Sequence, residues 1–142
     1  MNIQFIGMAC ALGLSALGSA FGAGYAALAS VGAWKKCYAA GKPAPFIMVA
    51  FSGAPLTQTI YGYLCLLLKL KDLGPVNPGM SLGLGIASGL AMALSAIAQG
   101  KAGAAAADAF GETGKGFSQY LTVVGLCETV ALFAMVFSLM AC

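Results

Sequence analysis

The chain has 142 residues, of which 61% are hydrophobic and only 8% are charged. A soluble domain of this size needs more polar surface than this composition provides, so a membrane protein is expected. The net charge of +3 comes from seven basic residues, all lysine, and four acids. Apart from Glu128, they are spread among the connections rather than gathered in a basic patch, so no nucleic-acid-binding surface is indicated.

Four long apolar stretches divide the sequence, at residues 1–34, 43–68, 73–100 and 116–142. Each exceeds the roughly 20 residues that an α-helix needs to cross a bilayer. The first has no positively charged start and is longer than the apolar core of a signal peptide, so we expect it to be a retained helix. The prediction is an all-α membrane protein with four transmembrane helices.

The first and third stretches carry small residues at every fourth position. These residues are Ser15, Ser19, Ala23 and Ala27 in the first stretch, and Ser81, Gly85, Gly89 and Ala93 in the third. In lipid, such faces let helix backbones approach closely. We therefore expect close helix packing along both faces.

The second half of the chain looks like a copy of the first. A shift of 70 residues superimposes the apolar stretches and connections of the two halves and places Gln58 on Glu128. We predict two duplicated helical hairpins, residues 1–72 and 73–142, of which only the second carries the carboxylate. A second acid at the same depth would double the buried charge.

The connections predict the orientation. Residues 35–43 contain three lysines and no acid, and lysine-rich connections prefer the cytoplasm. The loop between helices one and two is therefore expected to be cytoplasmic. The connection at residues 101–115, between helices three and four, then lies on the same side, and both termini lie outside.

Glu128 is the only Asp, Glu, Lys or Arg in residues 116–142, and it lies near their middle. A carboxylate at mid-membrane depth costs a few kcal/mol or more, so the default interpretation is an ion or proton site. The structural alternative is a protonated glutamic acid that only hydrogen-bonds a neighbouring helix.

The second stretch carries a polar helix face that includes Gln58, the residue that the 70-residue shift places on Glu128. Ala54, Thr57, Gln58 and Tyr61 are spaced i, i+3, i+4 and i+7, so they share one helix face. Pro55 has no N–H group and leaves carbonyls of the preceding turn without a helical donor.

Gln99, at the end of the third stretch, supplies another amide. Oxygen-only ligands suit a hard cation, whereas a proton needs only the carboxyl group. With Glu128 as the single carboxylate, a monovalent ion would make the site neutral. The alternative is that these amides and hydroxyls only bridge helices.

The run from Pro55 to Tyr61, together with Gln99 and the pair Glu128 and Thr129, resembles the proteolipid rotor subunit (K or c) of V-type and A/V-type ATPases. The resemblance covers the whole chain and is closest to the sodium-coupled bacterial kind. It implies assembly of many copies into a membrane ring. It also implies a site residue set in which Tyr61 hydrogen-bonds the carboxylate. The Na⁺ ligands implied are Glu128, Gln99, Gln58, Thr57 and the Ala54 backbone carbonyl.

This resemblance sets the functional expectations. The chain would have no catalytic activity alone and would translocate Na⁺, or alternatively H⁺, as the rotor component of a rotary ATPase or ATP synthase. Its partners would be other copies of itself, a stator subunit with a basic group, a central-stalk subunit and lipid, in the bacterial cell membrane. Two other classes stay open: a small four-helix secondary transporter and a structural four-span protein.

Overall fold

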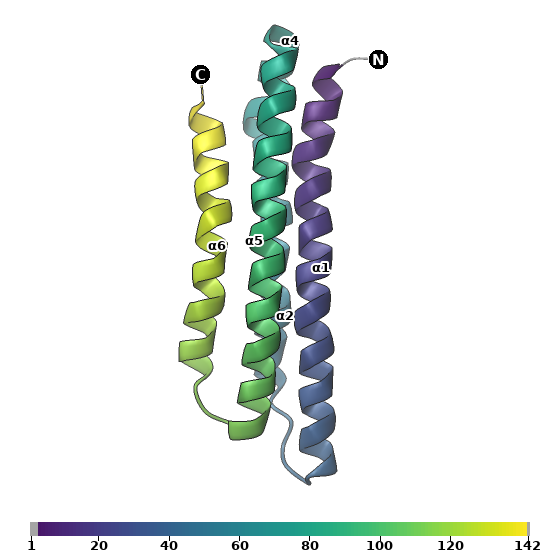
Figure 1. The fold of residues 1–142 in the computed structure, drawn as a ribbon, viewed down its shortest axis with the longest axis vertical. Helices are drawn as coiled ribbons and strands as arrows, with labels where there is room; N and C mark the ends of the chain where they lie inside the picture. Colours follow the sequence, from purple (N-terminus) through teal and green to yellow (C-terminus); the bar gives the residue numbers. More distant parts are fainter. Residues whose placement is uncertain (1–2, 142) are drawn as a thin grey trace.

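The computed structural model describes residues 3–141, and every element in this range is helical. Figure 1 shows long helices lying side by side, with a further part of the chain behind them. The elements are α1 (Ile3–Ala39), η1 (Phe46–Met48), α2 (Val49–Gly53), η2 (Ala54–Leu56), α3 (Thr57–Cys65), η3 (Leu66–Leu70), α4 (Lys71–Val76), α5 (Pro78–Thr113) and α6 (Phe117–Met140). The prediction of an all-α protein is confirmed.

Within residues 3–141, three helices are long and apolar enough to cross a membrane: Phe5–Ala39 within α1, Pro78–Thr113 (α5) and Phe117–Met140 (α6). The second apolar stretch and the connection after it instead form an interrupted rod, which runs from η1 to α4 and whose longest α-helix has nine residues. Pro55 lies in its 3₁₀ turn, because proline removes a backbone donor from the helix interior. The fourth spanning helix and the division into two duplicated hairpins stay predictions.

The helices are longer than the charges in the sequence suggest. The charges predict a connection over residues 101–115, but α5 continues to Thr113 and only residues 114–116 link it to α6. The alanine-rich sequence after Lys101 favours helix, and the helix ends at Gly114, whose φ of 64° suits glycine.

The same correction applies to the other two connections. The first two lysines of the 35–43 connection lie on α1, which runs to Ala39, and residues 69–76 are helical in η3 and α4. Lys36 extends from the end of α1 to Asp108 on α5, with its Nζ 2.8 Å from the carboxylate. Polar residues are tolerated on these helices because they lie exposed at the bundle end.

Small residues bring α1 and α5 together along much of their length. A Cβ atom on Gly100 would meet the backbone of Gly22, and one on Gly85 would meet the backbone of Gly7. These contacts leave no room for any side chain, as the small-residue pattern predicts. α1 and α5 are therefore the most closely packed pair of helices in the bundle.

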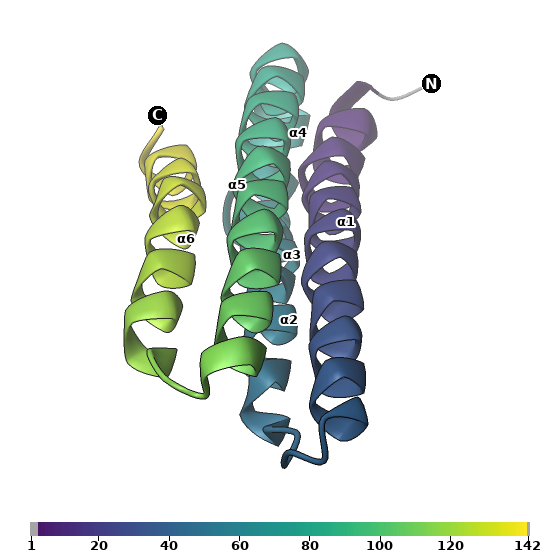
Figure 2. The same ribbon diagram turned by 60° about the horizontal axis from the view of Figure 1, so that its bottom comes forward.

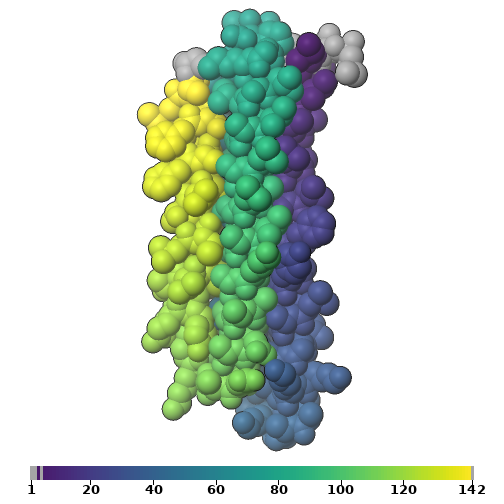
Figure 3. All heavy atoms as spheres, in the orientation of Figure 1, coloured from purple at the N-terminus to yellow at the C-terminus, as the bar shows by residue number. Residues whose placement is uncertain are grey.

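The interrupted rod and α6 pack against this pair. Figure 2 shows α2 and α3 behind α1 and α5, while α6 lies beside α5. In the space-filling view, α5 forms a continuous strip between α1 and α6 (Figure 3). Both ends of the described chain lie at the same end of the bundle (Figure 1).

Candidate ion-binding site

A polar layer crosses the bundle between two apolar clusters. One cluster, toward the 40–46 connection, is built around the aromatic rings of Phe51, Phe110 and Phe117, whose centroids lie 5.3–6.5 Å apart. The other surrounds the buried residues Cys65 and Met92. Side chains between the clusters come from the interrupted rod, α5 and α6, and close apolar packing on both sides isolates them along the bundle axis.

The interrupted rod contributes a hydroxyl and a carbonyl beside its 3₁₀ turn. Pro55 is fully buried there. The Thr57 hydroxyl donates to the Ala54 carbonyl oxygen over 2.9 Å, and it also lies 3.3 Å from Oε1 of Gln58. Three oxygens of this rod are thus adjacent.

Two amides connect this rod to α5 and α6. Gln58 Nε2 donates to Gln99 Oε1 over 2.8 Å, and neither residue is exposed. Gln99 Nε2 donates in turn to the Val124 carbonyl over 3.1 Å and to Glu128 Oε2 over 3.2 Å. The carboxylate of α6 is therefore held by an amide of α5.

A second donor reaches Glu128 from the interrupted rod, because the Tyr61 hydroxyl donates to its Oε1. The two carboxylate oxygens thus accept from different elements. Both residues are half-buried, so the carboxylate lies at the rim of the bundle rather than in its centre.

The structure brings together all six residues that the sequence singles out, from three separate stretches of the chain. Their role as Na⁺ ligands stays a prediction. Their chemistry is a single carboxylate surrounded by neutral oxygens, and no group of three His, Cys, Asp or Glu occurs among the described residues. This donor set fits a hard monovalent cation better than a transition metal.

Sequence reasoning missed two participants. Ser95 is buried and donates to the Cys127 carbonyl over 2.7 Å, and the Val124 carbonyl accepts from Gln99. Ser95 lies one helical turn before Gln99, so the i, i+4 spacing of two polar residues in an apolar helix was the available signal. No feature of the sequence marks a backbone carbonyl such as that of Val124.

The fold and this layer define a class: an all-helical membrane protein in which one carboxylate, halfway along the last helix, is held by side chains of neighbouring helices. Residues 82–141, which include most of α5 and all of α6, match the family model of the ATP synthase C subunit. The chain is also 32% identical over 136 residues to "A-type ATP synthase subunit K" of Methanocaldococcus jannaschii. That match covers 95% of this chain and 59% of the relative.

The chain therefore resembles the proteolipid subunits of the c and K type, and the resemblance seen in its sequence is confirmed by both comparisons. It spans about three-fifths of the length of the curated relative that it matches. The family also agrees with a location in a membrane, for which three of the helices are long and apolar enough.

Proposed function

We propose that the chain is the ion-carrying rotor subunit of a rotary ATPase or ATP synthase and that the ion is Na⁺. The observation that carries the proposal is the polar layer around Glu128. Na⁺ would bind among Glu128, Gln99, Gln58, Thr57 and the Ala54 carbonyl, and Tyr61 would hold the carboxylate in place.

The number of oxygens favours Na⁺ over H⁺. A proton on Glu128 needs only the carboxyl group, yet Gln58 and Gln99 are completely buried beside it. Burying amides in an apolar bundle is costly unless their hydrogen-bonding or ligand capacity is used. A cation would take the amide oxygens of Gln58 and Gln99 as ligands, whereas a proton on Glu128 makes no use of them.

Charge balance explains how such a site could move past lipid. An ionised Glu128 without an ion would be a net charge at mid-membrane depth, which is costly. One bound monovalent cation makes the site neutral. The loaded protein can therefore face lipid, and unloading needs a basic group nearby, which a stator subunit would supply.

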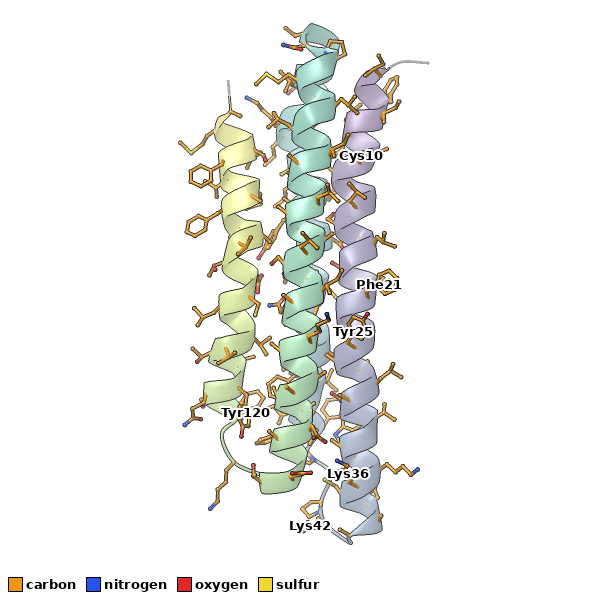
Figure 4. All side chains as sticks on the ribbon, in the orientation of Figure 1. Cys10, Phe21, Tyr25, Lys36, Lys42 and Tyr120 are labelled. Atoms are coloured by element: carbon orange, nitrogen blue, oxygen red, sulfur yellow. The ribbon has the colours of Figure 1, made fainter. Side chains whose placement is uncertain are left out.

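In the proposed ring, each face of the bundle has a defined environment. The closely packed helices α1 and α5 would form the inner wall, and α6 and the interrupted rod the outer wall. Large apolar side chains on α6, including Leu126, Val130 and Phe133, are more than half exposed and would contact lipid or the next copy. The central stalk would bind the end bearing Lys36 and Lys42 (Figure 4), which we place in the cytoplasm of a bacterial cell.

Protection of Glu128 from a carboxyl-reactive carbodiimide tests the ion. The reagent modifies the protonated acid, so Na⁺ bound to the carboxylate should block it, and the protection should increase with pH. Intact-mass spectrometry of purified protein would measure the labelled fraction with NaCl and with KCl as a control for ionic strength. Equal labelling in millimolar NaCl and KCl at mildly alkaline pH would overturn Na⁺ in favour of H⁺.

The size of the particle in mild detergent separates the rotor from a small transporter. A ring of many copies elutes far ahead of a dimer, so a dimer would contradict the rotor assignment whatever the ion.

A further inference from the structure

Ser95 on α5 makes a short hydrogen bond to a neighbouring helix. Its hydroxyl donates to the Cys127 carbonyl oxygen of α6 over 2.7 Å, and its exposed fraction is 4%. Ser88, seven residues earlier on the same face of α5, is equally buried but donates to the Leu84 carbonyl of its own helix, also over 2.7 Å. The bond of Ser88 stays within one helix, whereas the bond of Ser95 ties α6 to α5.

α6 depends on such bonds because little of its surface is buried. Its buried residues are Val124, Ala131 and Ser138. Grooves lie between α5 and α6 on either side of Ser95. One, of about 270 Å³, is lined by Ala102 and Tyr120 among others, and the second, of about 250 Å³, includes Ser88 and Ser138. Because side chains bordering a groove lack partner atoms on one side, packing restrains α6 only weakly at these two levels.

The bond of Ser95 lies beside the bonds that hold the carboxylate. Gln99, one turn after Ser95, donates from Nε2 to the Val124 carbonyl over 3.1 Å and to Glu128 Oε2 over 3.2 Å. The two carbonyls that α5 binds, those of Val124 and Cys127, are one turn apart on α6. A single attachment would let α6 pivot, whereas two successive attachments fix its orientation where Glu128 begins the next turn.

The lengths of these bonds indicate which residue sets the position of α6. The 2.7 Å bond of Ser95 has the preferred length for an O–H donor, whereas both bonds of Gln99 are near the long end of the range for an N–H donor. If α6 moved away by about 0.5 Å, both bonds of Gln99 would exceed the length at which a contact counts as a hydrogen bond. The bonds of Gln99 therefore depend on the spacing that Ser95 maintains.

Gln99 uses the two ends of its amide for different neighbours. Its Nε2 faces α6, and its Oε1 accepts from Gln58 of the interrupted rod. This Oε1 is one of the proposed Na⁺ ligands. Because the amide group is planar, the anchoring of Nε2 on α6 determines where Oε1 points. The position of α6 thus affects a neutral ligand as well as the carboxylate.

We propose that Ser95 is a positioning residue that holds α6 where Gln99 can bond Val124 and Glu128 together and so present its oxygen to Na⁺. The inference rests on the proposed Na⁺ function. Ser95 does not touch the ion, but a site that is already ordered loses less freedom when the ion binds. Removal of its hydroxyl should therefore weaken Na⁺ binding while the particle assembles normally.

Carbodiimide labelling of Glu128 against NaCl concentration in the assembled protein tests this role. Ser95→Ala should need about fivefold more NaCl for half-protection, the factor expected from one hydrogen bond. In ²²Na⁺ transport by the reconstituted complex, the NaCl concentration for the half-maximal rate should rise similarly, whereas the maximal rate should stay at the wild-type value. General damage to the bundle would instead lower the maximal rate.

Ser88→Ala is the matched control. It removes a serine hydroxyl that is just as buried and just as short in its bond, but that bond lies within α5, so the half-point should be that of wild type. If Ser95→Ala does not assemble, Ser95→Cys, whose thiol is a weak donor, should shift the half-point in the same direction. An unchanged half-point in the Ser95 variant, or an equal shift in Ser88→Ala, would overturn the inference.

A double variant tests whether Ser95 acts through Gln99. Gln99→Leu removes the amide whose place Ser95 sets, so adding Ser95→Ala should raise the half-point by less than about twofold over Gln99→Leu alone. A further increase of about fivefold would show that the two residues act independently, and it would overturn the positioning role. Absence of protection in the wild type would instead overturn the Na⁺ function on which the inference rests.

Discussion

Gln58 and Gln99 are joined by a hydrogen bond between their side-chain amides, with Nε2 of Gln58 2.8 Å from Oε1 of Gln99. The residues are 41 positions apart, and the bond ties the interrupted rod to α5. Because Gln99 also donates to Glu128, the carboxylate belongs to a chain of bonds that crosses three elements. A change at Gln99 should therefore affect both other helices at once.

Gln99→Leu should weaken the protection of Glu128 by Na⁺. The substitution removes one proposed ligand oxygen and the N–H donor of the carboxylate, and a hydrogen bond to a charged group contributes about 1.5–3 kcal/mol. We expect at least about a tenfold increase in the NaCl concentration for half-protection. Gln119→Leu, on the exposed first turns of α6, is the matched control and should behave as wild type. Equal half-points in both variants would remove Gln99 from the site.

Glu128→Gln should abolish ion-coupled transport while the particle keeps its size. Glutamine has nearly the same shape but cannot neutralise a cation, so the site loses its charge balance. Transport of ²²Na⁺ by the reconstituted complex would measure the loss. The control, Glu112→Gln, makes the same chemical change at the exposed end of α5, away from the site. It should retain transport. Coupled transport by the Glu128 variant would show that the carboxylate carries no ion.

Gly85→Ala should lower the yield of folded protein, since its Cβ would meet the backbone of Gly7. Overpacking of this kind costs about 1–3 kcal/mol. Gly83→Ala, two residues earlier on the same helix, has no atom within 4 Å of its added Cβ and should be neutral or slightly stabilising, because alanine favours helix. Yield and thermal stability in detergent would compare them. Similar behaviour of the two variants would contradict the close approach of α1 and α5.

The orientation can be tested with an introduced cysteine at the connection after α1. Cys37 itself is a poor target because it is only 4% exposed and its Sγ lies 3.5 Å from the Gly111 carbonyl oxygen. Lys42→Cys, in a variant without the native cysteines, should react with a membrane-impermeant thiol reagent only from the cytoplasmic side. Val76→Cys, at an 83% exposed position near the other end of the bundle, should react only from outside. The opposite pattern would reverse the predicted orientation.

Local patterns were sufficient for the class of protein and for naming the six residues that meet in the polar layer. The length of an apolar stretch, a lone charge within it and the spacing of Thr57 and Gln58 on one helix face are properties of neighbouring residues, so they can be read without the fold. The helix ends are harder to predict. The charge of Lys101 suggests the start of a connection, whereas its place on an exposed face lets α5 continue for twelve more residues.

The tertiary structure decided which groups meet. The contact between Gly22 and Gly100 sets how closely α1 approaches α5 beside Gln99 of the polar layer. The carbonyl of Val124 and the hydroxyl of Ser95 became participants only when α5 and α6 packed side by side. Such partners are far apart in the chain and chemically ordinary. Their importance arises from burial, which removes water as an alternative hydrogen-bond partner and makes each remaining donor and acceptor depend on its neighbour.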